Sequence, residues 1–184
     1  MHFATFQEYF PKIAEIETRS VTILEEDSPL QGMFGFIPSF CLDKKCDCRR
    51  AIVSVYKASI DSPVRPLATI SYGWENMSFY RNWSHGFDNE MLKQFKGPAL
   101  DIAQPQSPFA EYFLSVFIDN LQKDESYRER FPRHYAYFKR KTGMILPPEL
   151  KRYIKLFEDC PCGSGRMFKL CCGKARRGIK RRRR

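Results

Sequence analysis

The clearest chemical signal in the chain is Cys160-Pro161-Cys162-Gly163-Ser164-Gly165-Arg166-Met167-Phe168-Lys169-Leu170-Cys171-Cys172-Gly173. Its four thiols form a Cys-x-Cys pair and a Cys-Cys pair, with eight residues between the pairs. Four thiolates in a tetrahedral arrangement are the ligand set of a closed structural Zn²⁺ site. A segment this short cannot bury enough apolar surface to fold alone, so bound metal would supply its folding free energy, on the order of 10 kcal/mol. The spacing predicts a small zinc-bound module.

The same cysteines have two alternative roles, as disulfides or as inert buried thiols. Adjacent Cys171 and Cys172 can hardly bond to each other without strain. The chain also holds seven cysteines, an odd number that leaves one thiol unpaired in any intramolecular scheme. The complete ligand spacing therefore favours zinc at Cys160, Cys162, Cys171 and Cys172.

This stretch resembles the SEC-C motif, the zinc-binding module at the C-terminus of the SecA preprotein translocase ATPase and of many otherwise unrelated bacterial proteins. The resemblance covers about fourteen of the 184 residues and fills every ligand position. In that family the motif binds one zinc ion and serves as a docking surface, with the SecB chaperone and the ribosome as partners in SecA. The resemblance implies a zinc site and a docking role. The rest of the chain carries no ATPase signature, so it is not SecA.

The composition indicates one globular body with a small appendage, since 43% of the 184 residues are hydrophobic. Met1 to Ser20 contains three glutamates, and no apolar run approaches the roughly 18 residues needed to span a membrane. We expect a cytoplasmic protein. In that reducing compartment, cysteine clusters bind metal more often than they form disulfides.

The net charge of +10 is concentrated at the C-terminus. Residues 174–184 hold eight cations and no acid, which leaves +2 for the first 173 residues. Such a run is disordered alone and attracts phosphate polymers through salt-sensitive counterion release. It could also be a solvated terminus that only aids solubility. Next to a module carrying Arg166 and Lys169, it favours contact with the ribosome, RNA or an acidic protein surface.

The first half of the body is predicted to form a helix followed by an antiparallel sheet. Apolar residues at spacings of three and four predict an amphipathic helix over residues 3–18, interrupted or restarted at Pro11. Short β-branched and aromatic runs at 21–23, 33–40, 51–56 and 67–72 predict strands. Asp61-Ser62-Pro63 predicts a turn between the last two.

The second half reads as helical. Residues 89–95 are predicted to form a short helix that ends before Gly97-Pro98. A longer helix is predicted to begin at Ser107-Pro108, with an aromatic stripe that ends at Leu121. Asp124 caps a further helix that restarts at Pro132 and ends at Thr142-Gly143, and a last helix covers 149–158. We predict an α+β fold: a small antiparallel sheet with packed helices. The predicted divisions are 1–158 for the body, 159–173 for the zinc module and 174–184 for a disordered polybasic tail.

A second cysteine group lies between two predicted strands, at Cys41, Cys46 and Cys48. Three thiols within eight residues of a loop can share one ion, so we predict a second zinc here. His134 is the predicted fourth ligand, with His85, Asp43 and Asp47 as alternatives. Three thiols without metal are the simpler reading. The surrounding sequence also resembles one in bacterial proteins that carry a SEC-C tail, a resemblance that implies no activity.

The aromatic stretch 74–83 has two readings. Trp74, Phe79, Tyr80 and Trp83 surround Arg81, and aromatics interleaved with a cation can stack on RNA bases. The same spacing fits one face packed under the sheet.

Familiar catalytic motifs are absent from the sequence: there is no P-loop, G-x-G-x-x-G, H-E-x-x-H or G-x-S-x-G. We therefore predict a zinc-binding interaction protein and no enzyme, with docking through the C-terminal module and tail. The alternatives are an enzyme with an open zinc site at the first cysteine group, or a thiol redox switch there.

Overall fold

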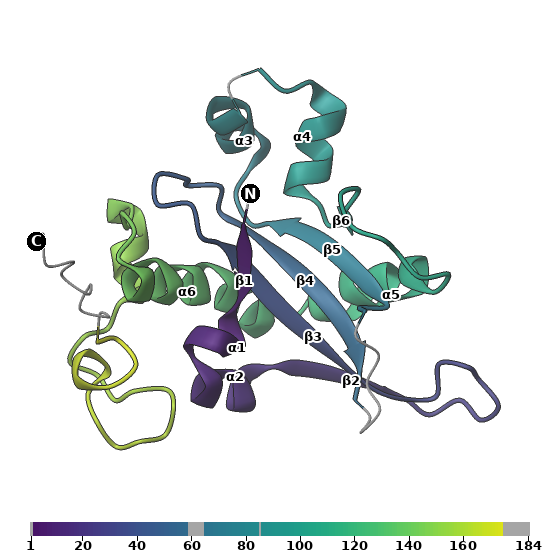
Figure 1. The fold of residues 1–184 in the computed structure, drawn as a ribbon, viewed down its shortest axis with the longest axis horizontal. Coiled ribbons are helices and arrows are strands. Elements are labelled where there is room, and N and C mark those ends of the chain that lie inside the picture. The colour runs from purple at the N-terminus through teal and green to yellow at the C-terminus, as the bar shows by residue number, and fades with distance from the viewer. Residues whose placement is uncertain (1, 59–64, 85, 175–184) are drawn as a thin grey trace, which may run out of the picture.

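The computed structural model describes residues 2–58, 65–84 and 86–174. They form an α+β fold built on a small antiparallel sheet, as predicted (Figure 1). The tail from 175 onward and the Asp61-Ser62-Pro63 turn lie outside the described residues.

The sheet runs in the order β1-β3-β4-β5-β6, and β2 also pairs with β3. All pairings are antiparallel, and Phe36 lies opposite Val55 while Val53 lies opposite Ile70. β1 pairs with the last three residues of β3 and β2 with its first half, so both occupy one edge. The strands are β1 (Phe3–Thr5), β2 (Arg19–Ile23), β3 (Gly32–Cys41), β4 (Arg50–Lys57), β5 (Ala68–Gly73) and β6 (Ala99–Leu100).

Alternation along the strands gives the sheet two chemically different faces. One face is apolar and buried, formed by Phe34, Phe36, Phe40, Val53, Val55 and Ile70. The opposite face of the central strands is largely polar, with Ser39, Arg50, Ser54, Thr69 and Ser71. The apolar face forms the main core and the polar face forms a cavity, described below.

The helices are α1 (Phe6–Tyr9), α2 (Pro11–Glu17), α3 (Met77–Ser84), α4 (Asn89–Lys96), α5 (Ala110–Val116) and α6 (Glu125–Thr142). α5 continues as one wide turn over Phe117–Leu121, and short 3₁₀ helices cover Pro148–Tyr153 and Phe168–Leu170. Side chains of Asp88 and Asp124 cap α4 and α6 by accepting hydrogen bonds from backbone N–H groups.

The core is aromatic and joins the sheet to α5 and α6. The ring of Tyr72 lies 5.4 Å from Phe117 and 4.8 Å from Phe131, and Phe40 lies 5.7 Å from Phe138. Edge-on and tilted contacts of this kind add to the burial of large apolar surfaces. α6 therefore carries the side chains that connect the sheet to the rest of the body.

Three sequence-based assignments need correction. Phe3–Thr5 form a strand instead of the first helical turn, because their backbone pairs with the end of β3. α6 runs without interruption from Glu125 to Thr142, so no helix restarts at Pro132, and its apolar side packs in the core. The last helix ends at Tyr153 instead of residue 158, and Phe157, which lies within the predicted range, is 71% exposed.

Candidate metal centres

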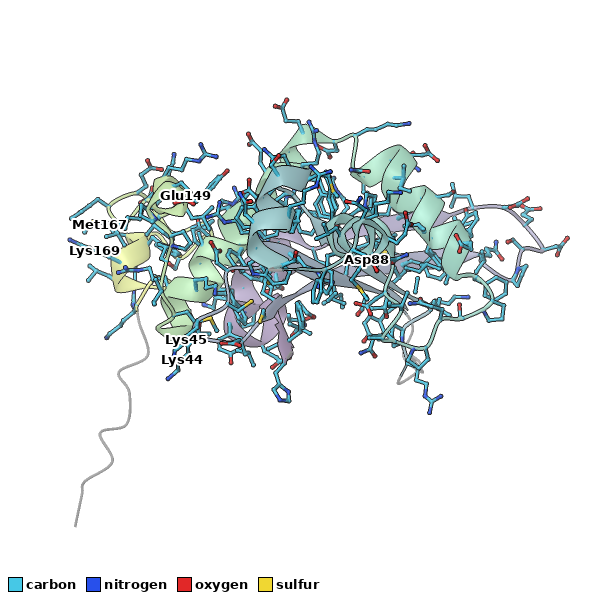
Figure 2. All side chains as sticks on the ribbon, turned by 90° about the horizontal axis from the view of Figure 1, so that it is seen from above. Lys44, Lys45, Asp88, Glu149, Met167 and Lys169 are labelled. Carbon is cyan, nitrogen blue, oxygen red and sulfur yellow. The ribbon has the colours of Figure 1, made fainter. Side chains whose placement is uncertain are left out.

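The C-terminal cysteines are brought together by a short looped-back segment. Asp159 bridges to Met167, and the Cys160 N–H donates to the Arg166 carbonyl at 2.8 Å. Gly163 and Gly165 take φ of +70° and +65°, a conformation that glycine adopts at no steric cost. Figure 2 shows Met167 and Lys169 at one end of the molecule.

The four sulfurs lie at the spacing that one metal ion requires. They are all within 4.8 Å of one another, with 3.5 Å between Cys162 and Cys171 and 3.9 Å between Cys171 and Cys172. Metal–sulfur bonds of about 2.3 Å in a tetrahedron place sulfurs about 3.8 Å apart. Cys160 and Cys162 are buried, while Cys171 and Cys172 are half-buried. This group could hold a metal ion with every ligand supplied by the protein.

The electrostatics of this group favour one thiolate before metal binds. Burial opposes ionisation, but hydrogen bonds from Ser164, Cys160 and Cys171 lower the pKa of Cys162 to about 6. Burial and hydrogen bonding with Cys160 raise the pKa of Cys172. Binding a dication would release the remaining thiol protons.

The second group lies where β3 turns into β4. Cys41 ends β3, and Cys46 and Cys48 precede β4, with the three sulfurs within 4.8 Å of one another. The Asp43 N–H points at the Cys41 sulfur at 3.4 Å, and the Cys46 N–H donates to the Asp43 carbonyl at 3.2 Å. Cys41 and Cys48 are fully buried and Cys46 is half-buried. This group could also hold a metal ion.

A buried lysine that the sequence did not single out accompanies these three thiols. Lys139 of α6 is 1% exposed, and its ammonium donates to the Cys46 carbonyl and lies 5.1 Å from the Tyr135 ring centroid. Hydrogen bonds from Cys46 and Cys48, together with the charge of Lys139, lower the pKa of Cys41 to about 2. Three thiolates around a dication carry one net negative charge, which a neighbouring ammonium balances. Only the fold brings Lys139 here, from 93 positions beyond Cys46.

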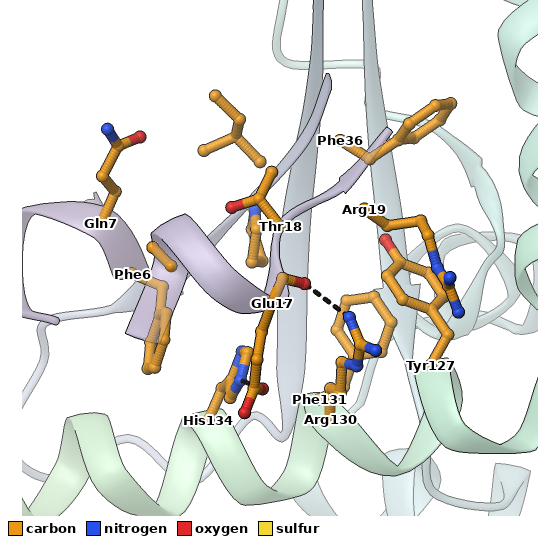
Figure 3. Close-up of a pocket in the computed structure, with 13 residues that line it drawn as sticks. Phe6, Gln7, Glu17, Thr18, Arg19, Phe36, Tyr127, Arg130, Phe131 and His134 are labelled. Atoms are coloured by element: carbon orange, nitrogen blue, oxygen red, sulfur yellow. Dashed lines mark hydrogen bonds and ion pairs between the residues drawn. The ribbon is translucent and has the colours of Figure 1, made fainter. Parts of the chain in front are cut away.

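His134, the predicted fourth ligand, lies with other partners (Figure 3). Its Nε2 is 2.6 Å from Glu17 Oε2, and its ring stacks on Phe6 at 3.9 Å between centroids. Burial lowers the pKa of His134, so a neutral imidazole donates to the Glu17 carboxylate. The structure does not bring His134 to the three thiols. Among the residues that it describes, no other His, Asp or Glu joins them; His85 lies outside those residues.

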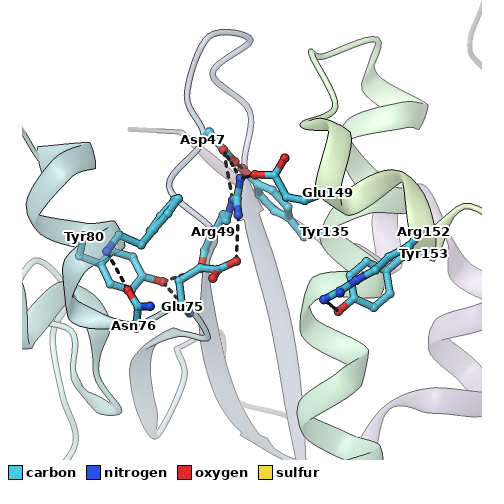
Figure 4. A network of polar contacts seen from close by, with 10 residues as sticks. Asp47, Arg49, Glu75, Asn76, Tyr80, Tyr135, Glu149, Arg152 and Tyr153 are labelled. Carbon is cyan, nitrogen blue, oxygen red and sulfur yellow. Dashed lines mark hydrogen bonds and ion pairs between the residues drawn. The ribbon is translucent and has the colours of Figure 1, made fainter.

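Arg49 holds the cysteine loop in place (Figure 4). Its guanidinium donates to Asp47 at 2.9 Å and to Glu75 at 3.0 Å, and it also pairs with Glu149. Tyr135 donates to the other oxygen of Asp47, at 3.3 Å. Asp47 is thus committed to this network, and Asp43 accepts from a backbone N–H within its own loop. The alternative ligands Asp43 and Asp47 therefore make other contacts.

The aromatic side chains of 74–83 pack against other parts of the body, with Tyr80 buried and Trp74, Phe79 and Trp83 half-buried. Tyr80 is fully buried and donates to the Arg49 carbonyl at 2.8 Å, and Trp74 lies 5.3 Å from the Tyr135 ring. Phe79 lies under the Arg49 guanidinium, 4.6 Å from its ring centroid. Trp83 contacts Phe95 of α4 at 5.6 Å. These contacts match the packing interpretation better than base stacking.

The C-terminal segment has a counterpart among known protein families. A family model for the SEC-C motif matches the chain at 158–174. Residues 158–174 are a SEC-C motif. The match leaves the body unassigned, and the chain matches no curated protein and no solved structure.

The SEC-C motif packs directly on α6. Phe168 is 1% exposed, and its ring lies 4.5 Å from that of Tyr137. Arg140 and Lys141, from the last turn of α6, donate to the carbonyls of Gly173 and Cys172 at 3.1 and 3.3 Å. Cys160, Cys162 and Phe168 are continuous with the core of the body. The described part of the chain contains no helix long and apolar enough to cross a membrane.

Proposed function

We propose that this chain is a zinc-binding interaction protein, with one zinc in the SEC-C motif and a second at Cys41, Cys46 and Cys48. The observation that carries the proposal is the presence of two separate thiol groups. Within each group, all sulfurs lie within 4.8 Å of one another, close enough to bind one ion. Zn²⁺ suits all-thiolate sites because it is borderline soft, redox-inert and readily tetrahedral. The SEC-C match at 158–174 supports zinc at the first site.

At the SEC-C site, Cys160, Cys162, Cys171 and Cys172 would hold the ion, and the four positions leave no place for a reactive water. A bound zinc there supplies a structural cross-link. Gly163 and Gly165 allow the chain to turn tightly between the first pair of ligands and the second. The arrangement supports a folded docking surface and no catalysis.

The surface beside this site supports the docking role. Leu170 and Phe157 are 59% and 71% exposed, and the Lys169 ammonium lies 3.9 Å from the Phe157 ring centroid. Exposed apolar side chains beside cations are typical of surfaces that bind partners. We propose that this surface and the tail at 174–184 contact the ribosome, RNA or an acidic protein, with salt-dependent affinity.

Zinc stoichiometry tests the first part of the proposal. Native mass spectrometry of the wild-type chain should give two zinc ions. The Cys171→Ser/Cys172→Ser and Cys46→Ser/Cys48→Ser variants should each give one. A wild-type chain without zinc after purification in metal-replete buffer would contradict the proposal.

Salt titration tests the docking part. Affinity for purified ribosomes and for a single-stranded RNA should fall steeply between 50 and 200 mM salt, by about a thousandfold if six or more phosphates are contacted. Deletion of 174–184 should flatten this slope. Binding that ignores both salt and the deletion would exclude the tail.

The three-thiol group supports a second candidate function. It has no fourth ligand among the described residues, and Cys46 is half-buried, so an ion there would keep one position for another molecule. Such a site would suit a zinc enzyme or a thiol redox switch. The switch predicts that hydrogen peroxide releases zinc from Cys41, Cys46 and Cys48 before the SEC-C site, which a chromogenic zinc chelator would report in the two double variants.

A further inference from the structure

The polar face of the sheet forms a cavity of about 600 Å³ that neither cysteine group uses. β3, β4 and β5 contribute its polar floor, and α4 and the segment after β6 form its walls. Phe95, Ile52 and Ile102 give it an apolar part. Its volume falls within the range typical of small-molecule sites, about 300–1,000 Å³.

A buried and incompletely paired cation lies in this cavity. The Arg50 side chain is 6% exposed, and among the described residues its guanidinium makes one short hydrogen bond, to Ser71 Oγ at 2.8 Å. Phe95 covers it at 4.1 Å, and the Asp101 carboxylate stays 4.0 Å away, beyond hydrogen-bond distance. Arg50 Nε is buried with no partner. A buried guanidinium normally has most of its five donors satisfied.

Two more buried polar atoms without partners belong to residues that line the same cavity. Thr69 Oγ1 comes from β5 and Gln94 Oε1 from α4. The Thr69 backbone is fixed by Gln106, which accepts from its N–H at 3.0 Å and donates to its carbonyl at 3.1 Å. The backbone of Thr69 is therefore fixed, while its hydroxyl has no partner. A buried polar group without a partner destabilises the folded state, and a ligand that pairs with it would remove that cost.

We propose that this cavity binds a small organic acid, with one carboxylate at Arg50 and an apolar body against Phe95. The carboxylate would accept hydrogen bonds from Arg50 Nε and Thr69 Oγ1, and a ligand hydroxyl would donate to Gln94. Asp101 offsets part of the charge of Arg50, so a single negative charge fits better than a phosphate dianion. The site is separate from the two metal centres and does not rest on their function.

The first experiment compares an acid with its neutral isostere on the full-length chain. The probes are 4-hydroxybenzoate, benzoate and hexanoate, with 4-hydroxybenzamide as the uncharged match and inorganic phosphate as the other anion. Protein-observed NMR should show perturbed amides in residues 50–54, 69–71 and 94–95 with at least one acid. The matched amide should bind about tenfold or more weakly, as expected for the loss of one charge-assisted hydrogen-bonded pair.

Thr69→Val provides a second and conservative test. It removes a hydroxyl that has no partner and keeps the shape, so the variant should unfold at the same or higher temperature and yet bind the acid several-fold more weakly. Thr22→Val in β2, an exposed position that does not line the cavity, is the matched control and should leave affinity unchanged. Arg50→Lys keeps the charge and removes Nε, and should also weaken binding.

Three outcomes would overturn the proposal. None of the three acids perturbs the cavity residues at millimolar concentration, the acid and the amide bind equally, or phosphate displaces the acid.

Discussion

At the residue scale, Lys139 is the side chain with the clearest consequence for metal binding. Its ammonium is buried beside the three body thiols and donates to the Cys46 carbonyl. We expect Lys139→Met to lower the zinc affinity of that site by about tenfold to a hundredfold, because the net negative charge of a three-thiolate site loses its counterion. Competition with a calibrated chelator measures this.

The control for Lys139 is Lys151→Met, which removes an exposed cation. The zinc affinity of the three-thiol site should be unchanged in Lys151→Met. Equal affinity in Lys139→Met and wild type would show that the ammonium only fills space near the loop.

The pair formed by His134 and Glu17 predicts acid sensitivity. Burial lowers the folded-state pKa of His134 below its ordinary value of 6.5, so its stabilising contribution is complete above that value and is lost as pH falls toward the folded pKa. The Glu17 pKa is also lowered, and its contribution is lost at still more acidic pH. His134→Gln keeps a hydrogen bond to Glu17 and cannot titrate.

We expect the melting temperature of wild type to fall more between pH 7.5 and 5.5 than that of His134→Gln, measured by circular dichroism. If the melting temperatures of the two proteins change equally with pH, His134 is not a source of the pH dependence.

At the element scale, the turn that carries Cys171 and Cys172 depends on Gly173. A Cβ at this position would lie 2.5 Å from the Phe168 ring, inside contact distance. Gly173→Ala should destabilise the chain by about 1–3 kcal/mol and reduce zinc occupancy of the SEC-C motif, measured by native mass spectrometry and thermal unfolding.

Gly35→Ala in β3 is the matched control, because nothing lies within 4 Å of a Cβ there. Its stability and zinc content should stay near those of wild type. A Gly173→Ala chain that keeps full zinc would mean that the Phe168 ring shifts freely.

Most elements of the body could be predicted from local patterns. Alternation predicted the strands of the central sheet, and Asp124 and Pro11 mark helix starts in the structure as they do in the sequence. Two of the misses share one cause. Phe3–Thr5 pairs with β3, and Pro132 stays within α6, because tertiary contacts outweigh local propensity.

At the scale of the whole molecule, the SEC-C motif and the body share one core. Phe168 packs on Tyr137, and the core of the body continues to Cys160 and Cys162. We therefore expect Cys171→Ser/Cys172→Ser to lower the temperature of a single cooperative unfolding transition, measured by calorimetry. If the chain instead divides into independent units after residue 158, the SEC-C motif should unfold in a separate, earlier transition and the unfolding of the body should be unchanged.

The grouping of the four SEC-C cysteines could be predicted from the sequence because they lie within thirteen residues of one another. The strands and most helices followed from periodicity, which is also local. The remaining contacts are decided by packing between residues far apart in the sequence. It brings Lys139 to the cysteine loop, His134 to Glu17, and Arg50, Thr69 and Gln94 to one cavity. These contacts depend on how the sheet and the helices pack, so they cannot be predicted from the spacing of residues along the chain.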